Sequence, residues 1–211
     1  EMGEDVWAPV PPSSNLSLKG AEIIFNTAAV TESIGKQTYL RTLLSQQSAR
    51  CLGGYVFSSC GFGESTTDVV FGGNGLIYEN GTLLAASERF SLKEQLIISE
   101  IDVERIRNER RNNTTFSANI AKYKDQPAIH IGTELVNQRD LILTRPIEAH
   151  PFVPQGDALN QRCEEIFEIQ VMGLAKRLIH TNCKTVVVGI SGGLDSTLAL
   201  LVCVKTFDKL G

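Results

Sequence analysis

The stretch Thr185-Val-Val-Val-Gly-Ile-Ser-Gly-Gly-Leu-Asp-Ser-Thr197 decides the fold of the C-terminal part of the chain. Its first half, Thr185–Ile190, is apolar without alternation, which is typical of a strand buried on both faces of a sheet. Gly192 and Gly193 allow a sharp turn and a close approach of bare backbone to a ligand. The acid and hydroxyls of Asp195–Thr197 suit the first turn of a helix, whose free N–H groups attract anions. Strand, glycine turn and helix start together predict a phosphate-binding loop.

The hexapeptide Ser-Gly-Gly-Leu-Asp-Ser at 191–196 narrows the kind of loop. A Walker A loop needs a lysine and a hydroxyl after its last glycine, and the dinucleotide fingerprint reads G-x-G-x-x-G. The hexapeptide instead resembles the pyrophosphate loop of the N-type ATP pyrophosphatases, which transfer AMP from ATP to an oxygen and release pyrophosphate. An ordinary glycine-rich turn is the alternative, but the whole hexapeptide in a strand–helix context is far more specific.

This resemblance implies a set of ligand-binding residues. ATP would be held by Gly189, Ile190, Ser191, Gly192, Gly193, Leu194, Asp195 and Ser196. Asp195 would also bind Mg²⁺, because a hard cation prefers carboxylate oxygen.

Composition places broad limits on the function. The chain has 211 residues, 42% of them hydrophobic and 21% charged, which is ordinary for a globular protein. A net charge of −4 argues against a nucleic-acid surface, and no apolar run is long enough to span a bilayer. The five cysteines form no C-x-x-C pair and fit reduced thiols in a cytoplasmic protein. Because the chain opens inside an apparent motif and ends soon after the phosphate loop, we expect an internal fragment of a larger protein.

A second group of motifs lies in the N-terminal part. Its members are Glu4-Asp-Val-Trp-Ala-Pro-Val-Pro-Pro-Ser13, Gly63-Glu-Ser-Thr-Thr-Asp68, and Gly75-Leu-Ile-Tyr-Glu-Asn-Gly81 with Ser87-Glu-Arg-Phe90. They resemble the nitrilase-like glutaminase domain of glutamine-dependent NAD synthetases, a family that carries a Ser-Gly-Gly-x-Asp-Ser loop downstream, as here. The resemblance covers nearly the whole chain.

The resemblance implies an α/β fold with two parts. Residues 1–125 would be the C-terminal part of a nitrilase-like α-β-β-α sandwich, and 126–154 a linker. Residues 155–211 would supply the first helix, strand, loop and helix of a doubly wound parallel sheet. The parent would be a carbon–nitrogen ligase that converts deamido-NAD to NAD with ATP, Mg²⁺ and ammonia from glutamine, and we expect a homo-oligomer.

The glutaminase motif departs from the family at its centre. The resemblance places the cysteine nucleophile at position 3, where this chain has Gly3, so no thioester can form there. Val30 stands where a serine is expected to help hold glutamine, whereas Lys36 matches the basic position near the substrate carboxylate or is a solvated helix-start lysine. Natural loss of the nucleophile, a substitution made to trap substrate and a sequence error would each explain Gly3. A substrate-trapping substitution at position 3 would not explain Val30, and we favour natural loss.

Two other functions stay open at this point. Another ATP-pyrophosphatase amidotransferase would share the loop at 191–196, but members such as GMP synthetase use a different glutaminase fold. A catalytically incomplete remnant or scaffold is the second alternative, and we expect the 211-residue chain alone to be inactive.

Short elements are expected between the motifs. We expect strands at 21–26, 54–59, 95–102 and 129–131, helices at 36–50, 103–111 and from Asp157 to about Leu178, and a final helix after the loop. Asn74-Gly75 and Asn80-Gly81 are typical of type I′ hairpin turns, and the prolines of Ala8–Ser14 argue against a helix there. Cys163 and Cys203 would be structural thiols on apolar helix faces.

Overall fold

The computed structural model describes residues 1–64, 68–123, 129–133, 143–147, 149–150, 152–153, 156 and 159–211. The chain divides into two compact units, Glu1–Arg145 and Pro146–Gly211. The division falls inside the range 126–154 predicted as a linker, while the exact domain boundaries stay a prediction.

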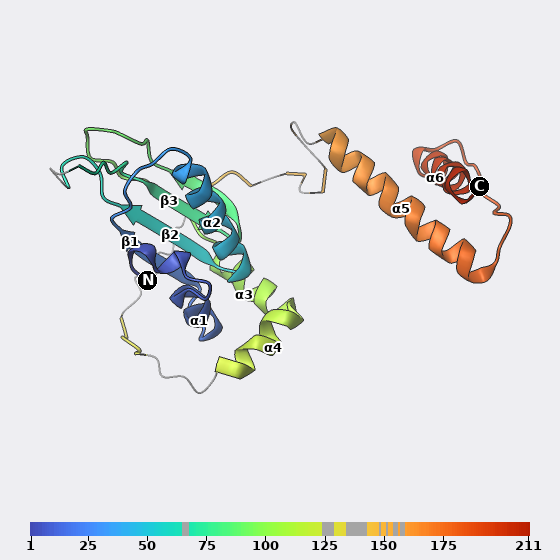
Figure 1. Cartoon of the computed structure of the whole chain (residues 1–211). Helices are drawn as coiled ribbons and strands as arrows, with labels where there is room; N and C mark the ends of the chain where they lie inside the picture. Colours follow the sequence, from blue (N-terminus) through green and yellow to red (C-terminus); the bar gives the residue numbers. More distant parts are fainter. Residues whose placement is uncertain are drawn as a thin grey trace. The chain divides into compact units, whose positions relative to one another are not determined.

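The first unit is a mixed α/β structure built around one sheet (Figure 1). Its elements are η1 (Gly3–Trp7), α1 (Pro12–Leu18), β1 (Ile23–Ala28), α2 (Lys36–Arg50), β2 (Gly54–Ser59), β3 (Gly75–Glu79), β4 (Thr82–Ala86), α3 (Val103–Asn112) and α4 (Thr114–Tyr123). The strands lie in the order β1-β2-β3-β4. β1 and β2 are parallel and joined through α2, whereas β2, β3 and β4 are antiparallel neighbours. The α/β class expected for this part is confirmed.

The core of the first unit lies between α2 and one face of the sheet. Leu40 and Leu44 of α2 are fully buried, as are the rings of Tyr55 and Phe57 on β2. This burial of large apolar side chains is the main driving force that holds α2 on the sheet.

The opposite face of the sheet is covered by the segment 91–102, which was expected to be partly a strand. This expectation is wrong, because 92–102 makes no ladder with a neighbouring strand. Two of its isoleucines, Ile97 and Ile101, instead lie on the sheet: a Cβ added to Gly54 would come within 2.8 Å of Ile101 Cδ1, and one added to Gly75 within 3.1 Å of Ile97 Cδ1. The glycines therefore make room for the covering segment.

Two turn predictions in the first unit have different outcomes. Asn80 and Gly81 have φ of +44° and +85° and join β3 to β4, as a type I′ turn requires. The Asn74-Gly75 turn is wrong, because Gly75 is already the first residue of β3. The prediction that Ala8–Ser14 forms no helix is wrong at its end, because helix α1 starts at Pro12. Proline at the first helical position loses no hydrogen bond. Residues 129–131 form no strand.

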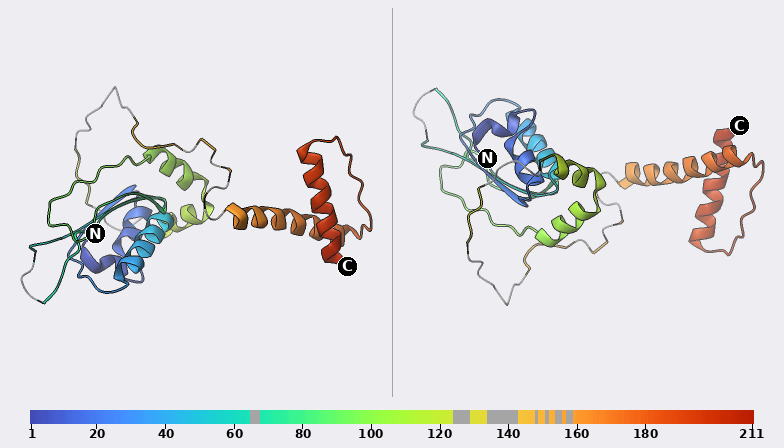
Figure 2. Two further views of the ribbon diagram at one scale, coloured as in Figure 1. Left: turned by 90° about the horizontal axis from the view of Figure 1, so that it is seen from above. Right: turned by 90° about the horizontal axis from the view of Figure 1, so that it is seen from below.

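The second unit contains helices α5 (Leu159–Thr181) and α6 (Leu194–Leu210), which cross and pack against each other (Figure 2). Val171 and Leu178 of α5 and Val202 of α6 are buried at the contact. The helix start expected at Asp157 lies outside the described residues. Among the residues that the structure describes, no helix is long and apolar enough to cross a bilayer.

Several burial predictions in the second unit are wrong. The strand expected at Thr185–Ile190 is absent: 183–190 has no regular structure, and Val187 is 98% exposed. A strand needs a neighbour for its backbone hydrogen bonds, and no strand is found among the described residues of this unit. Leu198 and Leu201 of α6 are exposed. Cys163, which was expected on an apolar helix face, is exposed too, whereas Cys203 is half-buried.

Candidate functional site

The phosphate loop predicted in the second unit forms a tight turn before α6. Gly192 has φ +84°, a conformation that side chains rarely adopt, so this position favours glycine. Gly193 is the N-cap of α6 with extended backbone (φ −87°, ψ 167°). The turn therefore leads directly into the first turn of a 17-residue helix, whose initial N–H groups have no partner within the helix.

Hydroxyl groups tie the loop to the start of α6. The N–H of Ser191 donates to Ser196 Oγ at 3.2 Å, and the two serine hydroxyls lie 3.1 Å apart. Ser196 Oγ and Thr197 Oγ1 donate to the carbonyl of Gly193 at 3.1 and 2.9 Å. Ser196 thus connects both ends of the loop, and Thr197, whose hydroxyl was expected in the first turn of the helix, supports the same turn.

Asp195 adds a carboxylate to this positive helix end. It lies in the first turn of α6 and is exposed. The described residues contain no cluster of three metal-ligating side chains. Asp195 fits Mg²⁺ as one carboxylate ligand, because this ion is usually held by one or two carboxylates together with phosphate oxygens.

In the first unit, Gly3 occupies the position expected for a nucleophile. Its φ is +57°, and a Cβ added there would meet no atom within 4 Å. Met2 forms a parallel bridge with Thr27 of β1, and the carbonyl of Gly3 accepts a hydrogen bond from Asn26 Nδ2 at 3.2 Å. The space beside Gly3 is open, and its backbone is positioned by β1.

Val30 and Lys36 lie near the end of the same strand. Val30 is 2% exposed and belongs to the hydrophobic core, while its N–H donates to Ser59 Oγ at 3.1 Å. Val30 therefore puts a buried apolar side chain where the family resemblance predicts a serine hydroxyl. Lys36 is the first residue of α2, and its Nζ lies 3.4 Å from Thr31 Oγ1. The structure thus places both positions around the carboxyl end of β1.

Glu32 is a polar residue of this region that sequence reasoning missed. Its side chain is 9% exposed and accepts from Asn74 Nδ2 at 2.9 Å and from Arg89 at 2.7 Å. Arg89 belongs to the Ser87–Phe90 motif, but the motif by itself does not point to Glu32 as its partner. The ion pair connects this motif to the loop that follows β1.

Neither cysteine of the first unit replaces the missing nucleophile. Burial raises the pKa of the thiol of Cys51, which is the buried C-cap residue of α2. Burial and the nearby Glu64 carboxylate raise the pKa of Cys60 as well. Because the thiolate is the nucleophilic form, both shifts lower reactivity near neutral pH.

Similarity to known proteins agrees with the motifs. A family model described as NAD synthase matches residues 166–210. The glutamine-dependent NAD(+) synthetase of Mycobacterium leprae (strain TN) is 40% identical over 215 residues, which cover 100% of this chain and 32% of that protein. The chain is homologous to the glutamine-dependent NAD(+) synthetases.

A more distant relative shows the same pattern of coverage. The glutamine-dependent NAD(+) synthetase of Thermotoga maritima is 26% identical over 98% of this chain and 34% of its own length. The chain therefore spans about a third of the length of these two relatives. Among solved structures, a carbon-nitrogen hydrolase from Helicobacter pylori G27 has a TM-score of 0.47 and 22% identity over 59% of this chain and 46% of that chain.

Proposed function

We propose that this chain is part of an ATP-dependent amide-forming ligase that converts deamido-NAD to NAD through an adenylated intermediate. The observation that carries the proposal is the 40% identity to a glutamine-dependent NAD(+) synthetase over the full chain. The loop at 189–197 supports it, because its glycine turn and free helix N–H groups suit a pyrophosphate. Both relatives described above are glutamine-dependent NAD(+) synthetases, which favours this function over that of other ATP-pyrophosphatase amidotransferases.

The proposed chemistry needs activation of a carboxylate. A carboxylate is a poor acceptor for ammonia, and transfer of AMP to one of its oxygens gives a good leaving group while pyrophosphate departs. Within the ATP-binding residues 189–196, the pyrophosphate would be held by Ser191, Gly192, Gly193 and Ser196, through backbone N–H groups and the two serine hydroxyls. Asp195 would hold Mg²⁺, which neutralises charge on phosphate oxygens.

The ammonia would come from solution instead of glutamine. Glycine has no nucleophile, and the raised pKa values of Cys51 and Cys60 argue against a substitute thiol. Val30 also removes a hydroxyl that the family resemblance assigns to glutamine binding. The glutaminase part would then have a structural role beside a working synthetase part.

The remaining assignments follow from the same proposal. The partners would be deamido-NAD and ammonia, and the parent would be a cytoplasmic homo-oligomer. Five cysteines that the structure leaves unpaired fit a reducing compartment. The 211-residue chain alone would be inactive. The alternative function, a catalytically incomplete remnant, makes the same prediction for the isolated chain.

The test is NAD formation by the full-length parent protein with position 3 confirmed as glycine. Deamido-NAD, ATP and Mg²⁺ are supplied once with glutamine and once with ammonium. We expect turnover with ammonium only. Turnover with glutamine would refute the proposed ammonia source, and no turnover with either would favour a remnant.

A further inference from the structure

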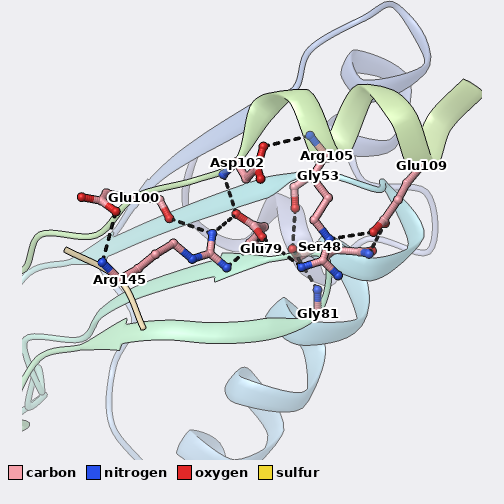
Figure 3. A network of polar contacts seen from close by, with 10 residues as sticks. Ser48, Gly53, Glu79, Gly81, Glu100, Asp102, Arg105, Glu109 and Arg145 are labelled. Carbon is pink, nitrogen blue, oxygen red and sulfur yellow. Dashed lines mark hydrogen bonds and ion pairs between the residues drawn. The ribbon is translucent and has the colours of Figure 1, made fainter. Parts of the chain in front are cut away.

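A buried carboxylate organises polar contacts at the end of β3. The side chain of Glu79 is 3% exposed. It accepts from the N–H of Asp102 at 2.6 Å, and Arg145 binds it with both terminal nitrogens, at 2.7 and 3.2 Å (Figure 3). Arg105 lies farther away, with NH1 3.9 Å from Glu79. Glu79 thus joins β3, the segment before α3 and the last residue of the first unit.

Residues 143–145, here called the strap, are also held by Glu100. The N–H and Oγ1 of Thr144 both donate to Glu100 Oε1 at 2.8 Å, and the N–H of Arg145 donates to Oε2 at 3.2 Å. Arg145 NH1 additionally reaches the carbonyl of Glu100 at 3.3 Å. Two carboxylates from different segments therefore hold two consecutive residues, Thr144 and Arg145.

The strap has little apolar anchoring of its own. Leu143 is 57% exposed, so burial of this side chain contributes little to docking. The charged contact is different, because a carboxylate as buried as Glu79 is costly without a paired cation. A planar guanidinium satisfies both carboxylate oxygens at once, which a lysine ammonium cannot reproduce.

We propose that the strap docks and releases as one local unit through the Glu79–Arg145 pair, with Arg145 as its positioning residue. In the docked state the chain leaves the first unit at a fixed point, immediately before Pro146. Release frees that point while the sheet and α2 stay folded. The inference uses no residue of the proposed ATP or glutamine sites and does not depend on the proposed function.

Amide hydrogen exchange of the 211-residue chain, resolved by residue, tests the proposal. The N–H groups of Thr144 and residue 145 report docking directly, because both donate to Glu100. We expect Arg145→Gln and Glu79→Gln each to speed their exchange at least tenfold. The N–H groups of Tyr55 and Ile77, which lie in paired strands, should keep their exchange rates.

A double variant separates local release from general loss of stability. Glu79→Gln with Arg145→Gln should exchange no faster at the strap than the faster single variant, because both remove one interaction. Arg107→Gln is the matched control: it removes an arginine paired with Glu22 on the surface and should leave the strap unchanged. Glu100→Ala removes the acceptor at a half-buried position and should also release the strap if Glu79 variants fold poorly.

Three results would overturn the proposal. Unchanged exchange at residues 144 and 145 in Arg145→Gln shows that the pair does not hold the strap. Equal acceleration at Tyr55 shows global and not local opening. Independent, multiplying effects of the two substitutions show that Glu79 and Arg145 do not act through each other.

Discussion

The side-chain nitrogen Nδ2 of Asn26 lies 3.2 Å from the carbonyl oxygen of Gly3 and donates a hydrogen bond to it. Asn26 is 1% exposed and donates a second bond to the hydroxyl of Tyr55 at 3.0 Å. Because Asn26 is fixed within β1, it fixes the backbone of Gly3 as well. The position expected for the nucleophile is therefore held in a left-handed conformation, φ +57°, with open space beside it.

Side chains at position 3 should destabilise the chain according to their tolerance of positive φ. Since nothing lies within 4 Å of an added Cβ, the cost comes from the backbone alone. We expect Gly3→Val to lower the free energy of unfolding by about 1–2 kcal/mol, and Gly3→Asn by clearly less, because asparagine enters this region more easily. Urea denaturation measures both. Equal stability of the two variants would contradict the assigned φ.

Ser196 should matter for ATP use in the full-length parent. Its hydroxyl accepts from the N–H of Ser191 and donates to the carbonyl of Gly193, so Ser196→Ala removes the link between both ends of the loop. We expect kcat/KM for ATP to fall at least about tenfold, as loss of roughly 1.4 kcal/mol implies. Ser196→Thr keeps a hydroxyl and is the matched control. An unchanged kcat/KM in Ser196→Ala would remove the loop from the proposed site.

Cysteine alkylation should follow exposure and pKa. Cys163 and Cys183 are exposed, whereas burial raises the pKa of Cys60 and of the more deeply buried Cys51. A raised thiol pKa lowers the thiolate fraction at pH 8, and that fraction increases as pH rises toward the pKa. With iodoacetamide at pH 8, we expect Cys163 and Cys183 to react first, Cys60 more slowly and Cys51 last. Mass spectrometry of digests gives the order, and rapid modification of Cys60 would reopen it as a substitute nucleophile.

The local motifs could be predicted from sequence because their information is local. Asn80-Gly81 specifies its own backbone conformation, and 191–196 specifies a turn and a helix start whatever surrounds it. The run Thr185–Ile190 shows the limit of this reasoning. Its β-branched residues favour a strand, but a strand forms only beside a partner, and sequence periodicity does not supply one.

The ion pairs made by Glu32 and Glu79 could not be predicted from the sequence, for a related reason. Glu32 pairs with Arg89, which is 57 residues away, and Glu79 pairs with Arg145, which is 66 residues away. Each glutamate by itself has the sequence appearance of a solvated side chain. Only the fold brings the arginines to them, so the partners of these glutamates could not be inferred from spacing.

Acidification should release the strap before it unfolds the sheet. Hydrogen bonds from the backbone and side chain of Thr144, and from the N–H of Arg145, lower the pKa of Glu100 below its ordinary value. A lowered carboxylate pKa means that docking is fully stabilised above the ordinary pKa of Glu100 and is lost as pH falls through the docked-state pKa. The charged group that contacts Glu100 is Arg145 on the strap. The guanidinium of Arg145 also binds Glu79, which is therefore a second carboxylate beside the strap (Figure 3).

Protection factors of the Thr144 and Arg145 amides, corrected for the intrinsic pH dependence of exchange, measure this release. We expect them to decrease between about pH 5 and pH 3, while those of Tyr55 and Ile77 stay constant over the same range. In Glu100→Gln the strap amides should be less protected at pH 7 and should lose the part of the pH dependence that comes from Glu100. If the variant keeps the full pH dependence, protonation of Glu100 does not control docking of the strap.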